Sequence, residues 1–89
     1  MNYIVYIIKS QKDGRFYFGQ TNNLQRRLED HNTGKSSYPK KYLLWDIYTF
    51  KEFDSRSEAY KVEKKLKNLK SQKKVIDFIK KNDFDKINQ

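Results

Sequence analysis

The sequence predicts a single α/β domain of the α+β type, in which a three-stranded, mainly antiparallel sheet is flanked by helices. Its 89 residues suit one domain. Two runs rich in β-branched and aromatic residues stand on either side of a turn-forming Asp13-Gly14 pair, which predicts a β-hairpin. A third such run and three segments of helical periodicity follow, in the order strand, strand, helix, strand, helix, helix.

The hairpin supplies the first two strands, over residues 3–8 and 15–21. Residues 3–8 are apolar on both faces, so we expect this strand to be covered on both sides. Two registers stay open: one pairs Tyr6 with Tyr17, and the other is set by a tight turn at Asp13-Gly14. Both registers place the two tyrosines on the same face of the sheet.

A first helix is predicted from a cap at Asn22 or Asn23 to about Asn32. A basic loop over residues 34–43 then leads to a third strand over residues 44–53. Period-two alternation along this strand predicts two faces. One face would carry Trp45, Ile47 and Thr49, and the other Leu44, Asp46, Tyr48 and Phe50.

The second helix is predicted to begin at a Ser55 cap, with Glu58 at the capping-box position and reaching back. A third helix near Ser71 completes the domain, which we expect to span residues 1–81. Residues 82–89 are expected to form a frayed tail. The apolar stripe of the second helix consists of Ala59, Val62, Leu66 and Leu69.

The residue types and patterns that the sequence lacks exclude several classes of site and function. With no Cys, the chain has neither disulfides nor a zinc site with thiolate ligands. No apolar run approaches the roughly 18 residues of a membrane-spanning helix, and no basic stretch precedes the first apolar run, as a secretory signal would require. We therefore expect a cytoplasmic protein with no membrane partner. The sequence also has no carboxylate cluster for two metal ions and no glycine-rich phosphate loop.

The charge indicates an anionic partner. Twenty Lys and Arg face eleven Asp and Glu, a formal net charge of +9. Such a charge on a small domain favours nucleic acid over a membrane surface, although a merely lysine-rich soluble surface is the competing interpretation. Residues 55–89 hold eleven basic and five acidic residues, against nine and six in residues 1–54. The C-terminal helices are thus the expected backbone-binding surface.

Five polar residues occupy positions that packing alone does not explain. Gly19 lies inside a predicted strand, where glycine often marks a close approach, and it shares a face with Tyr17. Core aromatics are the competing interpretation for the two tyrosines. The five residues are Tyr6, Tyr17, Arg27, His31 and Glu63.

The helical candidates also have competing interpretations. Arg27 and His31 are four residues apart and lie on or beside the buried stripe of their helix, so the guanidinium needs an anionic partner. A surface arginine with a buried stem and a satisfied helix-end histidine are the alternatives. Glu63 falls about 80° from the centre of its helix's apolar stripe, with five lysines close in sequence. The alternative for Glu63 is a structural salt bridge.

Several segments together resemble the GIY-YIG nuclease family. Val5-Tyr6-Ile7, with its tyrosine eleven residues before that of Tyr17-Phe18-Gly19, is similar to the two tyrosine motifs that name the family. Residues 20–27 resemble the stretch leading to the family's catalytic arginine, and residues 30–38 resemble small stand-alone bacterial members of the UPF0213 type. Residues 57–67 resemble the helix with the metal-binding glutamate. The resemblance covers residues 3 to about 70.

The resemblance implies a fold and a set of roles. The fold is a three-stranded antiparallel sheet with surrounding helices, the GIY-YIG endonuclease fold. Glu63 would be the sole protein ligand of Mg²⁺ or Mn²⁺. Tyr17 would act as or position the general base, and Tyr6 would position water or phosphate. Arg27 would bind the scissile phosphate, and His31 matches a position that is His in some members and Tyr in others.

The implied activity is metal-dependent endonuclease cleavage of nucleic acid, with DNA as the expected substrate, in repair or recombination. A Tyr with an ordinary pKa near 10 needs nearby positive charge to act as a base at neutral pH. The alternative function is a non-catalytic DNA- or RNA-binding module, and a protein partner is one candidate source of specificity. Some members use an Asn after the glutamate helix, for which neither Asn68 nor Asn82 is assigned. The expected nucleic-acid-binding residues are Arg27, Lys35, Lys40, Lys41, Lys64 and Lys67.

Overall fold

Four strands and three helices make up the part of the chain that the computed structural model describes, residues 3–32 and 44–86 without the side chains of His31, Asp85 and Lys86. The elements in chain order are β1 (Tyr3–Ser10), β2 (Phe16–Thr21), α1 (Leu24–Asn32), β3 (Trp45–Phe53), α2 (Arg56–Leu69), α3 (Gln72–Lys81) and β4 (Asp85–Lys86). The strands form one antiparallel sheet in the order β2-β1-β3-β4. The predicted three-stranded antiparallel sheet with flanking helices is confirmed, and β4 extends it by two residues.

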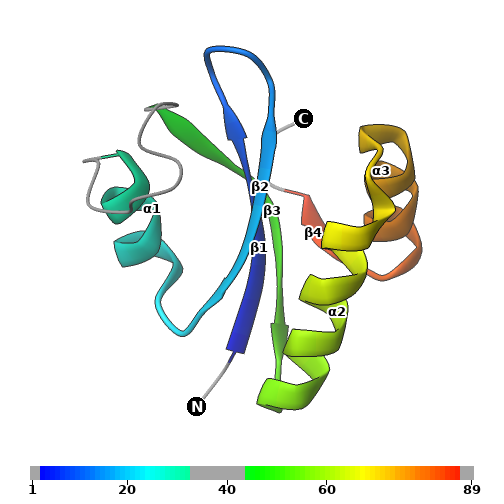
Figure 1. Ribbon diagram of the computed structural model, residues 1–89. Helices are drawn as coiled ribbons and strands as arrows, with labels where there is room; N and C mark the ends of the chain where they lie inside the picture. The colour runs from blue at the N-terminus through cyan, green and yellow to red at the C-terminus, as the bar shows by residue number, and fades with distance from the viewer. Residues whose placement is uncertain (1–2, 33–43, 87–89) are drawn as a thin grey trace.

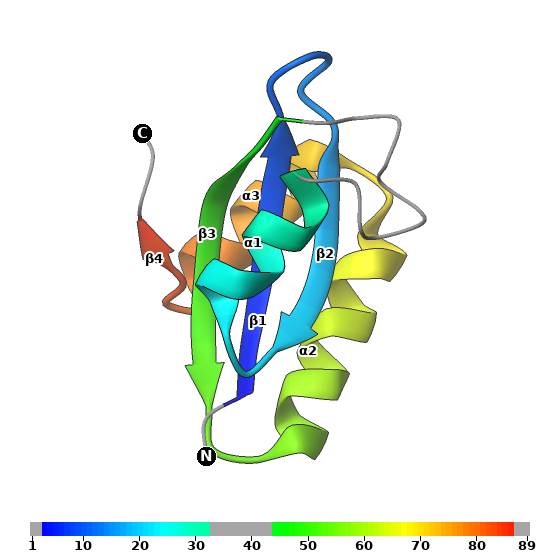
Figure 2. The ribbon, with the colours of Figure 1, turned by 90° about the vertical axis from the view of Figure 1, so that its left-hand side faces the viewer.

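The helices lie on both faces of the sheet. Figures 1 and 2 show α1 against one face and α2 with α3 against the other. Because β1 is central, Val5 and Ile7 pack into the core under α2 and α3, while Tyr6 and Ile8 pack into the core under α1. Each of these four side chains is at most 1% exposed. The expectation that this strand is covered on both sides is therefore correct.

The hairpin register lies between the two that the sequence left open. Tyr6 pairs with Gly19, and Ile8 pairs with Tyr17. The connection is longer than a two-residue turn: Gly14 adopts φ 75° and donates its N–H to the Ser10 carbonyl over 2.9 Å. Because the pairing has the same parity as both expected registers, Tyr6 and Tyr17 still share a face.

The expected alternation along β3 is correct as far as Tyr48 and wrong from Thr49 onward. The β1–β3 pairing shifts there, because Ile8 pairs with Ile47 while Ile7 pairs with Thr49, so that Tyr48 is an extra, bulged residue. A bulge reverses the faces that follow it. Phe50 therefore packs with Ile47 in the core under α1, while Tyr48 packs under α2 and α3 against Phe16, with ring centroids 4.9 Å apart.

Side-chain caps define the helix starts that the sequence indicated. The Asn23 side chain accepts from the Arg26 N–H of α1 over 3.1 Å, which selects Asn23 over Asn22. Ser55 accepts from the Glu58 N–H of α2 over 3.1 Å. The Glu58 carboxylate accepts from the Ser55 hydroxyl over 3.4 Å, so it reaches back to the cap residue as expected. Ser71 caps α3 in the same way, accepting from the Lys74 N–H.

The expectation of a tail that frays from Asn82 was wrong for residues 82–86. The Asn82 side chain donates to the Phe78 carbonyl over 2.7 Å, and the Asn82 carbonyl accepts from Lys51 over 2.6 Å. The Phe84 side chain is only 7% exposed and packs near Phe78, with ring centroids 6.4 Å apart. One buried aromatic ring therefore holds this segment against the sheet, where β4 pairs with β3.

Two further expectations concern the remaining chain. The predicted basic loop over residues 34–43 lies outside the described residues. Within residues 3–32 and 44–86, no helix has the length and apolar character needed to cross a membrane.

Burial of Phe84 predicts that the C-terminal segment stabilises the domain. Phe84→Ala should lower the free energy of unfolding by about 3 kcal/mol, the lower end of the range for buried aromatic residues. Lys80→Ala, at an exposed position of α3, should change it by less than about 0.5 kcal/mol. Urea unfolding followed by Trp45 fluorescence measures both values. Equal stability of the two variants would show that the segment does not contribute to the core.

Candidate active site

Tyr6 and Gly19 form the centre of the candidate site through one close approach. The two residues are directly paired on β1 and β2, and the Tyr6 ring crosses the Gly19 backbone. A Cβ atom on Gly19 would lie only 2.5 Å from Tyr6 Cζ. Glycine is thus required here by the tyrosine ring. With this space the phenol reaches α1, where its oxygen accepts a hydrogen bond from Arg27 Nε over 3.2 Å.

The Tyr6–Arg27 contact joins a neutral phenol to a charged guanidinium. Burial raises the pKa of Tyr6, and the hydrogen bond and charge of Arg27 oppose this shift only in part. The Tyr6 hydrogen bond in turn raises the pKa of Arg27. At neutral pH, Tyr6 therefore keeps its proton and Arg27 keeps its charge. This pair presents a hydrogen-bond donor and a positive charge side by side.

Tyr17 lies on the same face of the sheet, two residues before Gly19 on β2. Its ring is half-buried and packs near Trp45, with centroids 6.1 Å apart. Tyr17 is close enough to interact electrostatically with both Tyr6 and Arg27. Tyr17 and Arg27 therefore belong to one group of interacting side chains.

Glu63 comes from the opposite layer and faces the edge of β2. Tyr60, three residues earlier on α2, lines a hollow with Gln20 of β2. Lys67, four residues later, lines another with Tyr17. Residues three and four apart on a helix lie on one side of it, so Glu63 faces β2 between these two positions. Its negative charge contributes to the raised pKa of Tyr6, which ties Glu63 electrostatically to the tyrosine.

Glu63 also forms the salt bridge that was its competing interpretation. Lys67 Nζ lies 2.8 Å from Glu63 Oε2 in an i,i+4 pair. The Glu63 side chain is 16% exposed, whereas that of Lys67 is 54% exposed. The lysine therefore approaches from the solvent side, while Glu63 is the more buried partner. The salt bridge therefore neutralises the carboxylate without enclosing it.

The other expected site residues are not all brought together. His31 belongs to α1, one turn after Arg27, but its side chain lies outside the described part of the structure. Lys64 is exposed and stands about 180° around α2 from the buried stripe. Asn82 caps α3 through the Phe78 carbonyl, and Asn68 is exposed on α2. Lys35, Lys40 and Lys41 lie outside the described residues.

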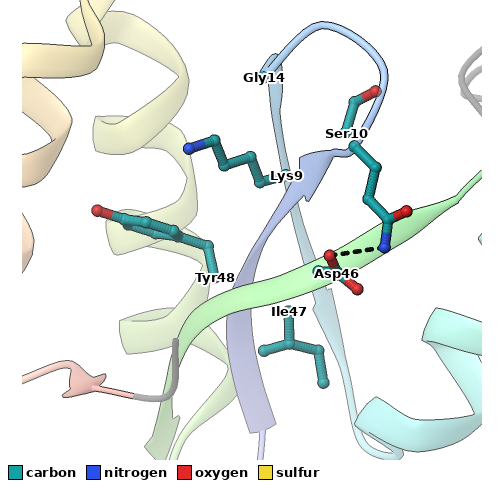
Figure 3. Close-up of a pocket in the computed structure, with 7 residues that line it drawn as sticks. Lys9, Ser10, Gly14, Asp46, Ile47 and Tyr48 are labelled. Carbon is teal, nitrogen blue, oxygen red and sulfur yellow. Dashed lines mark hydrogen bonds between the residues drawn. The ribbon is translucent and has the colours of Figure 1, made fainter. Parts of the chain in front are cut away.

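A hollow of about 740 Å³ at the hairpin end of the sheet is a different site (Figure 3). Its polar groups are engaged with one another. Gln11 donates to Asp46 over 2.8 Å, and Lys9 Nζ lies 5.9 Å from the centre of the Tyr48 ring. None of the five candidate residues lines it. Volume alone therefore does not identify the candidate active site in this molecule.

The donor set at the candidate site suits a hard cation that keeps most of its water. Within residues 3–32 and 44–86, no three acidic or histidine side chains are grouped as a metal cage. Mg²⁺ is commonly held by one or two carboxylates, with water at the remaining positions. The half-buried Glu63 carboxylate fits this pattern, whereas a closed zinc site would not.

Sequence analysis missed two residues beside Glu63. Arg56 and Tyr60 line the hollow with Gln20 and Ser57. Their spacing of seven and three residues before Glu63 places them on its side of the helix, and this spacing was readable in the sequence. The exposure of Tyr60 was not, because aromatic residues are usually buried.

The close approach at residue 19 predicts a specific effect of adding one methyl group. Gly19→Ala should destabilise the protein by roughly 1–3 kcal/mol, because the buried Tyr6 ring has no room to move. Without such a clash, Ala in a strand should be as good as Gly or better. In a double-mutant cycle with Tyr6→Val, measured by urea unfolding, the two effects should be clearly less than additive. Additive effects would show that the ring does not cause the loss.

The raised pKa of Tyr6 predicts a loss of stability at high pH. The folded state favours the neutral phenol, so this contribution is complete below the unfolded pKa near 10 and is lost as pH rises through the higher folded pKa. Tyr6→Phe should therefore lose less stability than the unaltered protein above pH 10. Unfolding curves across this range measure the difference, with Tyr60→Phe, at an exposed position, as control. Identical curves for Tyr6→Phe and the control would contradict the shift.

Comparisons with known proteins indicate the family of the chain. A family model described as the GIY-YIG catalytic domain matches residues 2–75. The chain is 38% identical over 66 residues to a UPF0213 protein of Oceanobacillus iheyensis, covering 73% of this chain and 76% of the relative. It is 33% identical over 76 residues to the UPF0213 protein YazA of Bacillus subtilis, covering 84% and 76%.

A solved structure agrees as well. The solution NMR structure of a UPF0213 protein from Bacillus halodurans superposes with a TM-score of 0.54 at 33% identity, covering 83% of this chain and 79% of that one. The range that the family model matches, residues 2–75, contains Tyr6, Tyr17, Arg27 and Glu63. The chain therefore belongs to the GIY-YIG domain family and is similar to its small UPF0213 proteins.

Proposed function

We propose that this protein is a metal-dependent endonuclease that hydrolyses phosphodiester bonds in nucleic acid, with DNA as its substrate. The observation that carries the proposal is the convergence of Tyr6, Tyr17, Arg27 and Glu63 from four separate elements, β1, β2, α1 and α2. Phosphodiester hydrolysis needs a positioned water, a group that takes its proton and positive charge for the phosphate. These four side chains and one cation provide each requirement.

Arg27 and Tyr6 are the proposed phosphate-binding pair. Arg27 keeps its charge because the phenol oxygen accepts its Nε–H, and its remaining N–H groups can bind phosphate oxygens. Tyr6 keeps its proton and can donate it in a hydrogen bond to phosphate or water. Both act as donors, so neither serves as the base.

Tyr17 is the proposed residue that positions the attacking water and receives its proton. It lies beside Arg27, and Lys67 lines the hollow next to it. In the proposed step the Tyr17 oxygen receives the proton of the attacking water. The water oxygen then forms a bond to phosphorus as the bond to the leaving sugar oxygen breaks. His31 remains a proposed member of the site from its position one turn after Arg27.

Glu63 is the proposed ligand of Mg²⁺ or Mn²⁺. When bound, such an ion would neutralise charge developing on the phosphate and the leaving oxygen. Glu63 holds its carboxylate at the β2 edge, and Lys67 balances that charge in the salt bridge. Lys67 is then placed to contact the phosphate backbone once Glu63 has another cation.

A nucleic-acid-binding module without cleavage is the second candidate function. The Glu63–Lys67 salt bridge favours it, because a carboxylate that is already paired need not bind a metal. The net charge of +9 supports both candidates equally.

Cleavage assays on single-stranded, duplex and branched DNA and RNA should show metal-dependent cutting that EDTA abolishes. Glu63→Gln and Arg27→Gln should each lower the rate at least about 100-fold, since each removes charge stabilisation of the transition state. Tyr17→Phe should lower the rate by about 100-fold, the usual contribution of a general base. Lys80→Ala, at an exposed position of α3, serves as a charge-matched control for Arg27→Gln.

Binding measurements on the same proteins separate the two candidates. If Glu63→Gln still binds the substrate but does not cut it, Glu63 has a cutting role. If the unaltered protein binds nucleic acid but cuts none in either metal, the binding module is correct and the endonuclease proposal is wrong.

A further inference from the structure

One side of α2 carries a row of residues that continues beyond the proposed catalytic centre. Arg56, Tyr60, Glu63 and Lys67 are spaced by four, three and four residues, so their side chains lie in a row along the helix. Arg56 and Lys67 are separated by about 16 Å along the axis. The row therefore extends beyond a single phosphodiester link on both sides of Glu63.

The Arg56 end of this row is hollowed. Gln20 of β2 faces Arg56, Ser57 and Tyr60 of α2 across a space of about 610 Å³. Tyr60 is 57% exposed, and among the described residues only Leu44 is a comparably exposed large hydrophobic side chain. An exposed aromatic ring beside an arginine is typical of surfaces that bind nucleic-acid bases. Gln20 directly follows Gly19 on β2, so the hollow lies beside the same part of this strand as the Tyr6 ring, on the opposite face of the sheet.

The Lys67 end has a different character. There Lys67 lines a hollow with Phe16, Tyr17 and Phe18, and basic residues follow at Lys70 and Arg15. The aromatic rings at this end are partly buried, whereas its basic side chains are exposed, and exposed positive charge suits the sugar-phosphate backbone. The two ends therefore offer base stacking on one side of Glu63 and backbone binding on the other.

We propose that the hollow lined by Gln20, Arg56 and Tyr60 binds one unpaired nucleotide next to the bond that is cut. Its base stacks on the Tyr60 ring, its phosphate lies against the Arg56 guanidinium, and the Gln20 amide meets the base edge. This inference rests on the proposed function for the position of the cut, while the nucleotide site itself depends only on the hollow.

The inference defines a class of substrate. A base can stack on a side chain only when it has left the duplex stack, so the protein acts where bases are unpaired, in single strands, loops or branch points. Continuous duplex would present phosphates to Arg56 and Lys67 but no base face to Tyr60. The Tyr60 ring stacks equally on DNA and RNA bases, so parallel DNA and RNA probes identify which of the two nucleic acids is preferred.

The test uses the Glu63→Gln protein, which keeps the substrate intact, and single-stranded oligonucleotides with one 2-aminopurine moved along the strand. Stacking on Tyr60 should quench the fluorescence at one position beside the cleavage site found with the unaltered protein. Adding Tyr60→Ala should abolish that quenching and weaken single-strand binding about tenfold, while leaving duplex binding within about twofold. Tyr60→Phe should retain both stacking and affinity. Arg56→Ala should weaken single-strand binding more than Lys80→Ala, the charge-matched control on α3.

The outcomes separate this inference from the proposed function. Quenching that persists in Tyr60→Ala, equal affinity of Tyr60→Ala and Tyr60→Phe, or no binding of single strands would overturn the inference, even if the protein cuts nucleic acid. Tyr60-dependent quenching in a protein that cuts nothing would uphold the nucleotide site and reject the endonuclease. Circular dichroism and thermal unfolding of each variant check that a loss of quenching or binding is caused by the changed site and not by unfolding. Because Tyr60 is exposed, its Phe and Ala variants are compatible with the helix.

Discussion

The passage of the Tyr6 ring over Gly19 is the constraint on which the candidate site depends. Tyr6 belongs to the central strand and is 1% exposed, so its position is fixed by the core. Only a residue without a side chain on β2 lets its hydroxyl reach Arg27 on α1. The Tyr6 side chain therefore makes both a packing contact of the core and a polar contact of the candidate site. For this reason the site cannot be rearranged without also disturbing the sheet.

The two-layer cover of the sheet explains why the site forms at an edge. A central strand that is apolar on both faces needs helices on both sides, and Figure 2 shows α1 and α2 on opposite sides of β2. Side chains from these two helices can approach each other only around the β2 edge, because the sheet separates them elsewhere. Arg27 interacts with Tyr6 and Tyr17 from the α1 side, and Glu63 interacts with Tyr6 from the α2 side. The placement therefore follows from fold geometry and requires no long loop.

Local signals predicted the parts of the fold that local physics decides. The caps at Asn23, Ser55 and Ser71 each depend on one side chain and a neighbouring N–H, so residue type and spacing sufficed. Packing between distant segments decided the rest. The bulge at Tyr48 goes with its stacking on Phe16, and the ordered segment after α3 depends on burial of Phe84, neither of which periodicity encodes. The candidate side chains were recognisable from spacing and resemblance. The passage of the Tyr6 ring over Gly19, in contrast, is visible only in the structure.

The electrostatics of the site connect the salt bridge to the proposed chemistry. The Glu63 carboxylate pairs with the nearest cation, Lys67, which is one turn away on the same side of α2. A metal ion that takes its place would release the ammonium beside Tyr17, where the phosphate backbone needs positive charge. Metal binding and substrate binding would then assist each other. A metal ion would bind the Glu63 carboxylate in place of Lys67, and the phosphate backbone would bind the Lys67 ammonium in place of Glu63. Under the proposed function, the salt bridge that first suggested a purely structural glutamate would be the resting arrangement of a site that exchanges Lys67 for a metal ion.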